Sequence, residues 1–179
     1  MTAATRQTGG MTAATDLLID GLGRVQENVH AVLDHLSRDQ LAARVDPGAN
    51  SIAWLVWHLT RIQDDHVAGV ADTGQLWIAD GWAERFALPL DQHDHGFGHT
   101  SEQVASVQAD AELLAAYHDA VHDRSVAYVG GLADEDLARV VDRRWDPPVT
   151  LGVRLVSVVD DCAQHVGQAA FVRGMLERG

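Results

Sequence analysis

Four long stretches of the sequence place apolar residues three or four positions apart, and this spacing limits the possible folds more than any other feature. The stretches cover roughly residues 15–35, 51–70, 110–129 and 151–177. Each starts beside a residue that can cap a helix, namely Thr15, Asn50 or Ser51, Asp110 and Thr150. No alternating strand pattern competes with them. The sequence therefore predicts an all-α fold, a four-helix bundle.

The segments between these helices carry their own signals. Residues 72–100 combine glycine, tryptophan and histidine with weak periodicity, which is typical of a lid or a binding loop between the second and third long helices. Residues 134–140 are predicted to form one short helix, and residues 145–148 a rigid, extended approach to the last helix. The motif MTAAT occurs at residues 1–5 and again at 11–15. We therefore expect residues 1–14 to be an N-terminal extension and residues 15–179 to be a single domain.

Composition excludes several classes of function. The formal net charge is −13, which argues against binding to nucleic acid or to an anionic membrane surface. All 13 basic residues are arginine, which excludes a Schiff-base lysine and a P-loop lysine. The only cysteine, Cys162, excludes an internal disulfide and an all-cysteine zinc site. No signal peptide or membrane span is readable, so we expect a cytoplasmic protein, for which a homodimer is a compatible assembly.

Ionisable residues stand where two of the helical patterns call for apolar ones. His58 lies in the apolar turn Trp54–Leu59, and Asp161 and His165 lie four residues apart on one face of the last helix. A buried carboxylate without a partner would be costly, and a metal ion would satisfy the carboxylate and the imidazole together. Two plainer alternatives remain open: a core histidine that is hydrogen-bonded, and a local ion pair between Asp161 and His165.

Three segments carry a resemblance to a known family: residues 50–61 (NSIAWLVWHLTR), 98–104 (GHTSEQV) and 160–168 (DDCAQHVGQ). They resemble the DinB-like superfamily of four-helix-bundle metalloproteins, and in particular its actinobacterial branch that uses the thiol mycothiol. The resemblance implies that His58, Asp161 and His165 bind a divalent metal. Many members have histidine at the position of Asp161. Zn²⁺ suits such a set best, and Ni²⁺ and Fe²⁺ also fit.

The resemblance also implies a function. Coordination to a divalent ion deprotonates a thiol, and the thiolate of mycothiol could then attack an electrophile held under residues 72–100, which is a detoxifying S-transfer. Two alternatives stay open at this point: a mycothiol-dependent isomerase of the maleylpyruvate type, and a metal-binding bundle without turnover. Cys162 is not expected to be the nucleophile, because its position on the helix points toward apolar neighbours.

Further residues are candidates for binding the substrates. Asp65 lies two turns beyond His58 and could bind the thiol or accept its proton, or could simply be a solvated acid. His99 is, with Asp65, a candidate catalytic residue and is expected near the mouth of the pocket. Trp82 and Arg85 suit an aromatic lid with one cation, and Arg144 could hold an anionic group. For these last three residues, packing or a surface ion pair is an equal alternative.

Overall fold

The computed structural model describes residues 12–178, and within them the chain is mostly helical. Its long helices are α1 (Ala13–Leu33), α3 (Ile52–Ala71), α7 (Ala111–Gly130) and α8 (Leu151–Leu176). Short helices connect them: α2 (Arg38–Ala42), α4 (Leu76–Ala79), α5 (Trp82–Phe86) and α6 (Ser101–Ser106). A 3₁₀ helix (Asp134–Ala138) and the strands β1 (Val140–Asp142) and β2 (Val149–Thr150) precede α8.

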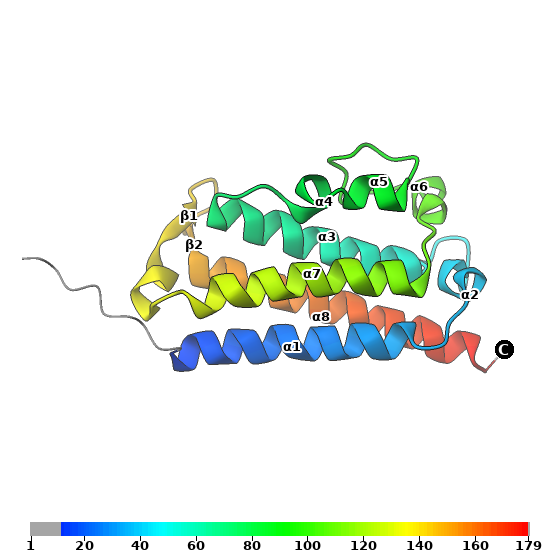
Figure 1. The fold of residues 1–179 in the computed structure, drawn as a ribbon, viewed down its shortest axis with the longest axis horizontal. Coiled ribbons are helices and arrows are strands. Elements are labelled where there is room, and N and C mark those ends of the chain that lie inside the picture. The colour runs from blue at the N-terminus through cyan, green and yellow to red at the C-terminus, as the bar shows by residue number, and fades with distance from the viewer. Residues whose placement is uncertain (1–11, 179) are drawn as a thin grey trace, which may run out of the picture.

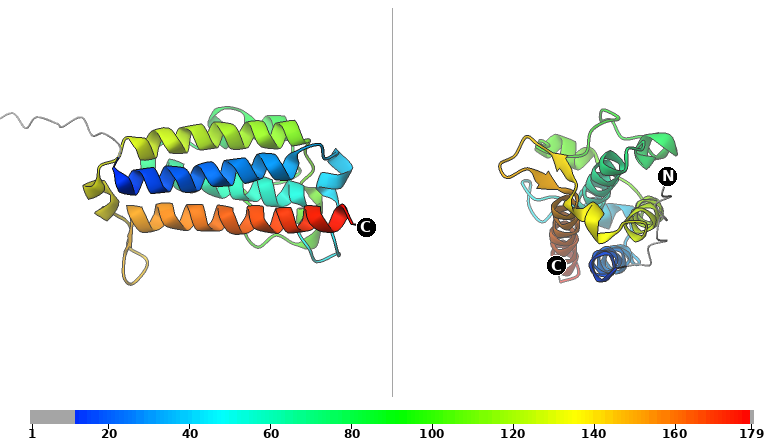
Figure 2. Two further views of the ribbon diagram at one scale, coloured as in Figure 1. Left: turned by 90° about the horizontal axis from the view of Figure 1, so that it is seen from below. Right: turned by 90° about the vertical axis from the view of Figure 1, so that its left-hand side faces the viewer.

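The long helices lie side by side, as Figures 1 and 2 show. Both α1 and α3 pack against α7 and α8. Helix α3 runs in the opposite direction to α8, so the C-terminal end of α3 and the N-terminal end of α8 meet beside the β1–β2 hairpin. The segment that contains α4 and α5 covers α3 at the other side of the molecule from α1 (Figure 1). None of the described helices is long and apolar enough to cross a bilayer.

Helix α3 forms the centre of the hydrophobic core. Every residue from Ile52 to Arg61 is buried, which is the reason that its sequence is apolar on all sides over this stretch. Ser51 caps it, because its hydroxyl accepts a hydrogen bond from the Trp54 amide at 3.1 Å. Any polar side chain on this helix is therefore in an environment that penalises charge, and His58 is one of them.

Several local predictions differ from the structure. Helix α1 begins at Ala13 with Thr12 as its cap, because Thr12 and Thr15 form a reciprocal capping box. Of the N-terminal extension predicted at residues 1–14, residues 1–11 lie outside the described residues, and Ala13 and Ala14 belong to α1. Residues 72–100 contain α4 and α5 and are not irregular throughout. The helix predicted at 134–140 ends at Ala138, because Val140 pairs with Thr150 in a hairpin that the sequence pattern did not indicate.

Candidate metal centre

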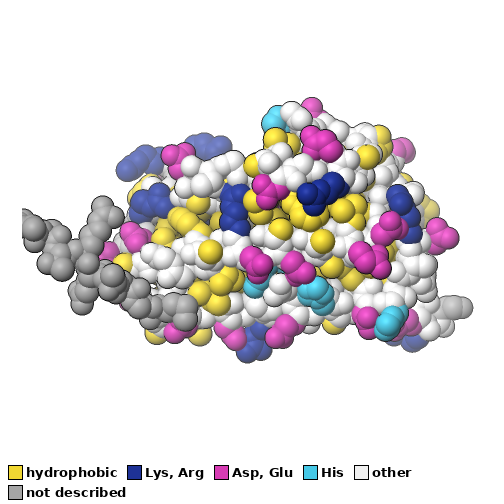
Figure 3. All heavy atoms as spheres, viewed as in Figure 1, with side chains coloured by type: hydrophobic (Ala, Val, Ile, Leu, Met, Phe, Trp, Pro, Cys, Tyr) yellow, Lys and Arg dark blue, Asp and Glu magenta, His cyan; other side chains and the backbone are white. Residues whose placement is uncertain are grey.

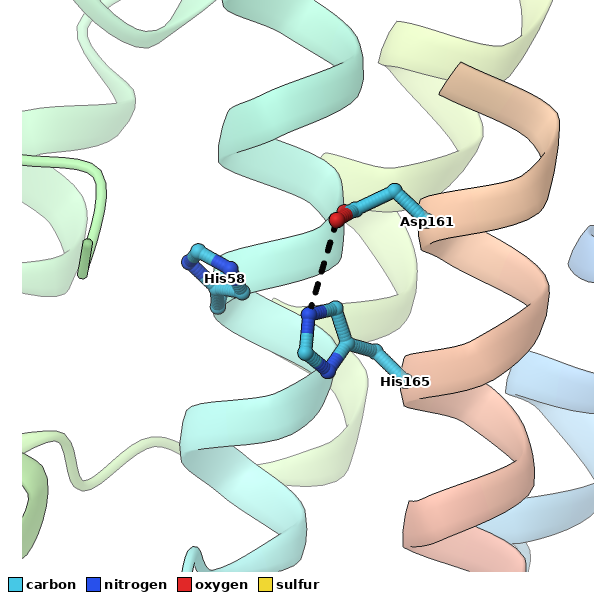
Figure 4. A group of neighbouring side chains, drawn as sticks. All are labelled: His58, Asp161 and His165. Carbon is cyan, nitrogen blue, oxygen red and sulfur yellow. Dashed lines mark ion pairs between the residues drawn. The ribbon is translucent and has the colours of Figure 1, made fainter. Parts of the chain in front are cut away.

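Three side chains from the two central helices meet at one point (Figure 4). His58 comes from the middle of α3, and Asp161 and His165 come from adjacent turns of α8. One candidate ligand atom from each residue lies within 4.8 Å of the others. The sequence placed these residues on facing helices, and the packing of α3 against α8 brings them together. Two imidazoles and one carboxylate form a donor set that could hold a divalent ion.

Hydrogen bonds fix the orientation of both imidazoles. Nδ1 of His58 donates to the carbonyl oxygen of His95, and Nδ1 of His165 donates to Oε1 of Gln168 at 3.0 Å. Each ring then keeps the lone pair of Nε2 for another partner. Nε2 of His165 lies 3.7 Å from Oδ1 of Asp161, which is too long for a good hydrogen bond. This is the arrangement that metal-binding histidines adopt, with one nitrogen held by the protein and the other directed at the ion.

The surroundings of the Asp161 carboxylate show whether a metal ion would fit the centre. Its Oδ2 atom is buried and has no hydrogen-bond partner among the residues that the structure describes. A buried carboxylate oxygen without a partner is unfavourable and rare in folded proteins. A cation between Asp161 and the two imidazoles would satisfy this oxygen, so the residues present fit a metal ion.

Burial keeps His58 neutral. The side chain is 5% exposed, and this burial lowers its pKa from the usual 6.5 to about 4, although the bond to His95 acts in the opposite direction. Trp54 stacks on the imidazole with ring centroids 4.6 Å apart and planes inclined by 13°. A neutral and immobilised imidazole is the form that binds metal ions.

A loop from the α5–α6 connection closes over His58 at Gly96. This residue has a φ of +96°, and a Cβ atom there would lie 2.7 Å from Nδ1 of His58 and 3.1 Å from the Trp54 ring. Only glycine allows both the backbone conformation and the close approach. Sequence reasoning did not identify Gly96 or the carbonyl of His95 as parts of the centre, although Gly96 and Gly98 beside three histidines were a visible signal of a constrained loop.

Comparison with known proteins assigns the chain that carries this centre to a family. The model of the mycothiol-S-transferase family matches residues 17–178. The chain belongs to this family. A crystal structure described as a conserved protein of Enterococcus faecalis is 34% identical, with a TM-score of 0.84 over 89% of this chain and 94% of that one. No curated protein matches the chain.

In this member of the mycothiol-S-transferase family, His99 lies behind the centre and not at a pocket mouth. Its side chain is 3% exposed. Nδ1 accepts a hydrogen bond from Nε1 of Trp54 at 3.0 Å, and Nε2 lies 2.9 Å from Oδ2 of Asp94. Nδ1 of His99 thus contacts the indole that stacks on His58, while Nε2 is directed at the carboxylate of Asp94.

Trp82 and Arg85 do not reach the centre either. Trp82 is buried in the core, where its ring packs against Tyr117 of α7 at a centroid distance of 5.4 Å. The guanidinium of Arg85 lies over the Trp82 ring at 4.4 Å. Packing, the alternative weighed for these residues, describes their contacts, and neither has a contact with the three candidate ligands within the described part of the chain.

Asp65 and Arg144 line a separate cavity of about 580 Å³ between α3, α8 and the β1–β2 hairpin. Oδ1 of Asp65 accepts a hydrogen bond from Gln75 at 2.6 Å, and Oδ2 lies 3.5 Å from Nδ1 of His66. Arg144 forms a two-pronged ion pair with Asp142, at 3.0 and 2.8 Å. The two predicted substrate contacts therefore lie together, at a distance from the candidate ligands.

Proposed function

We propose that the protein is a metal-dependent transferase that joins mycothiol to an electrophile, and that its active centre lies within a DinB-like four-helix bundle. The observation that carries this proposal is the convergence of His58, Asp161 and His165, with both imidazoles held through Nδ1. The match of residues 17–178 to the mycothiol-S-transferase family supports mycothiol as the thiol substrate. Zn²⁺ is the ion we favour, because it accepts nitrogen, oxygen and sulfur donors without redox chemistry.

Each residue at the candidate centre has its own role in the proposed reaction. His58 and His165 present neutral nitrogen donors, and Asp161 brings a negative charge that attracts the cation. Trp54, held by His99, keeps the His58 ring in place and covers one side of it. A divalent ion, when bound, favours the thiolate form of a thiol at neutral pH, which is the form that attacks carbon electrophiles. Three protein donors would leave coordination positions open for a substrate, as in catalytic sites.

Cys162 takes no part in this chemistry. Its side chain is fully buried, and its Sγ donates to the carbonyl of Leu59 at 3.5 Å. Burial raises the pKa of the thiol well above its usual range, so that it stays protonated. The nucleophilic sulfur must therefore come from a small molecule. We also infer that the protein works in a reducing cytoplasm, and a homodimer stays a prediction that gel filtration can test.

The test combines metal content with turnover. Protein loaded with Zn²⁺, Ni²⁺ or Fe²⁺ is assayed for loss of mycothiol in the presence of 1-chloro-2,4-dinitrobenzene. We expect about one metal ion per chain and metal-dependent consumption of the thiol. His58→Ala, Asp161→Ala and His165→Ala should each lose the ion and the activity, whereas His93→Ala, which removes an exposed loop histidine, should keep both.

Other outcomes would redirect or reject the proposal. Metal binding without any consumption of thiol by a range of electrophiles would leave a metal-binding protein without turnover. Rearrangement of maleylpyruvate with no net loss of mycothiol would identify an isomerase. Wild-type protein that takes up none of the three metals would contradict the assignment of the centre itself.

A further inference from the structure

An arginine-rich cavity lies beside the β1–β2 hairpin, between α3 and α8, the two helices that also carry the three candidate metal ligands. It is bounded by Asp65 and His66 of α3, by Arg154 of α8, by Arg143 and Arg144 of the hairpin, and by Arg139, which directly precedes β1. Figure 3 shows dark-blue side chains gathered at the hairpin end of the molecule, and since the sequence has no lysine all of them are arginines. Four guanidiniums face two carboxylates, Asp65 and Asp142, in a chain whose net charge is −13.

The charges within this cavity are not balanced. Asp142 forms ion pairs with two arginines, because its Oδ2 lies 2.8 Å from Nη2 of Arg144 and 3.4 Å from Nη2 of Arg154. Arg139 uses Nη2 for the carbonyl of Val70 and the hydroxyl of Tyr128, at 3.1 and 3.0 Å. Within residues 12–178, neither Arg139 nor Arg143 has a carboxylate within ion-pair distance. The cavity therefore has spare guanidinium donors, which match the planar geometry of a carboxylate or another oxyanion.

The position of the cavity relates it to the metal centre. Asp65 follows His58 by seven residues on α3, and Arg154 precedes Asp161 by seven residues on α8. Because the two helices run in opposite directions, both steps lead toward the hairpin (Figure 1). At 1.5 Å per residue, each step covers about 10 Å. A ligand that filled both places would carry an anionic group about two helical turns from its reacting atom.

We propose that the electrophile conjugated by this protein is an anion, whose carboxylate or similar oxyanion binds in the arginine-rich cavity while its reactive carbon lies at the metal centre. This proposal rests on the proposed function. Mycothiol is an acetylated cysteine joined to an aminosugar and inositol and has no carboxylate or phosphate, so the anionic group belongs to the electrophile. The cavity thus determines which acceptors are used.

A matched pair of acceptors tests the proposal. 6-(Iodoacetamido)hexanoate has a carboxylate far enough from its iodomethylene carbon to span the two places, and its primary amide is the uncharged counterpart. In the reaction with either acceptor, the sulfur of mycothiol bonds to that carbon, the carbon–iodine bond breaks, iodide leaves with the electron pair, and the thiol proton passes to buffer. We expect a kcat/KM for the carboxylate about tenfold higher than for the amide, because an ion pair with a guanidinium is lost in the amide.

Variants separate the cavity from general charge effects. Arg143→Ala removes an exposed guanidinium that has no partner in the described chain, and it should lower the carboxylate-to-amide ratio of kcat/KM about tenfold. Arg144→Ala should lower the same ratio. Arg24→Ala makes the same change in net charge on α1, where Arg24 pairs with Asp20 at 2.7 Å, and should leave the ratio unchanged.

A binding measurement keeps this proposal distinct from the proposed function. Calorimetry with the unreactive 6-acetamidohexanoate should show binding to wild-type protein that weakens about tenfold in Arg143→Ala. If the carboxylate and amide acceptors are turned over equally and Arg143→Ala changes nothing, the anionic-acceptor proposal is wrong while S-transfer stands. If 6-acetamidohexanoate binds in an Arg143-dependent manner and no acceptor is turned over, the cavity is an anion site and S-transfer is rejected.

Discussion

At the scale of single residues, Gly96 is where the covering loop comes closest to the candidate centre. Gly96→Ala would place a methyl group 2.7 Å from Nδ1 of His58 and would strain a φ of +96°. The loop must then move away, and the hydrogen bond from His58 to the carbonyl of His95 is lost. We expect Zn²⁺ affinity, measured by competition with a chelator, to fall about 10- to 100-fold, as is usual when a metal ligand loses its supporting hydrogen bond.

Gly98→Ala is the matched control for this change. Gly98 also has a positive φ, of +75°, but a Cβ atom there would meet nothing within 4 Å. Backbone strain is therefore common to the two variants, and the contact with His58 is present in only one. Equal losses of Zn²⁺ affinity in both variants would show that loop strain, and not the support of His58, is what matters.

His118 on α7 should make the stability of the fold depend on pH. The side chain is fully buried, and this burial lowers its pKa from 6.5 to about 3, with the nearby His122 acting in the same direction. Between these values the unfolded chain binds a proton that the folded chain does not, so the free energy of unfolding falls as the pH falls. The loss is about 1.4 kcal/mol per pH unit for this group.

Urea unfolding at pH 4.5–7, with chelator present, measures this effect. His118→Phe should make the pH dependence shallower by about that amount, whereas His93→Gln, an exposed histidine, should not change it. An unchanged slope in His118→Phe would mean that His118 does not titrate with folding in this range.

The ionisable residues at the candidate centre could be found from the sequence because they interrupt apolar helices, where a charge is expensive. The supporting groups could not be found in this way. The carbonyl of His95 belongs to the backbone and leaves no trace in residue types, and the place of His99 depends on Trp54, 45 residues earlier in the chain. Partners that are distant in sequence are set by tertiary packing, which periodicity does not report.

At the scale of elements, helix α4 depends on a cap from another helix. Gln75 at its N-terminus makes no capping hydrogen bond, but the carboxylate of Asp64 on α3 accepts from the amides of Leu76 and Trp77 at 2.9 and 2.8 Å. The same carboxylate accepts from the hydroxyl of Tyr117 at 2.9 Å. It also lies 3.8 Å from Nη1 of the fully buried Arg61. Asp64 thus attaches the segment over α3 to the core.

Asp64→Asn and Tyr117→Phe should separate the two kinds of contact. Asn removes the charge that balances Arg61, and a buried charge left unpaired costs about 3–5 kcal/mol. Phe removes one hydrogen bond, at about 1 kcal/mol. Urea unfolding should show this difference, and hydrogen exchange should show faster opening of residues 72–86 in Asp64→Asn. Equal destabilisation by both variants would contradict a role for the buried ion pair.

The same elements explain which parts of the fold were predictable. The prediction of a mostly helical chain is confirmed, because a helix of 20 or more residues repeats its apolar spacing over several turns. Helices α4 and α5 have four and five residues, too few to show a period. The β1–β2 hairpin, with strands of three and two residues, gives no alternating pattern for the same reason.

At the scale of the whole molecule, a bound metal ion should stabilise the fold by linking α3 to α8. The unfolded chain does not hold its three ligands together, so binding adds to the free energy of unfolding by mass action. At a free Zn²⁺ concentration 100 times the Kd, the gain is about 2.7 kcal/mol. For a chain of this size, this corresponds to a rise in Tm of about 5–10 °C. Thermal unfolding with Zn²⁺, and then with excess chelator, measures the change.

Asp161→Asn is the control for this stabilisation, because it keeps the size of the side chain and removes the charge of one ligand. Its Tm should rise much less with Zn²⁺ than that of the wild type. A rise of the same size in both proteins would place the stabilising ion elsewhere in the molecule.

Under the proposed S-transfer to electrophiles, the burial of Cys162 has a chemical consequence. Thiols and amines are the side chains that such compounds attack first, yet this sequence has no lysine and encloses its one sulfhydryl beneath α3, between Leu59 and Gln63. With such substrates the protein would present neither a lysine amine nor an exposed thiol, and it should resist the alkylation that inactivates enzymes with an exposed cysteine.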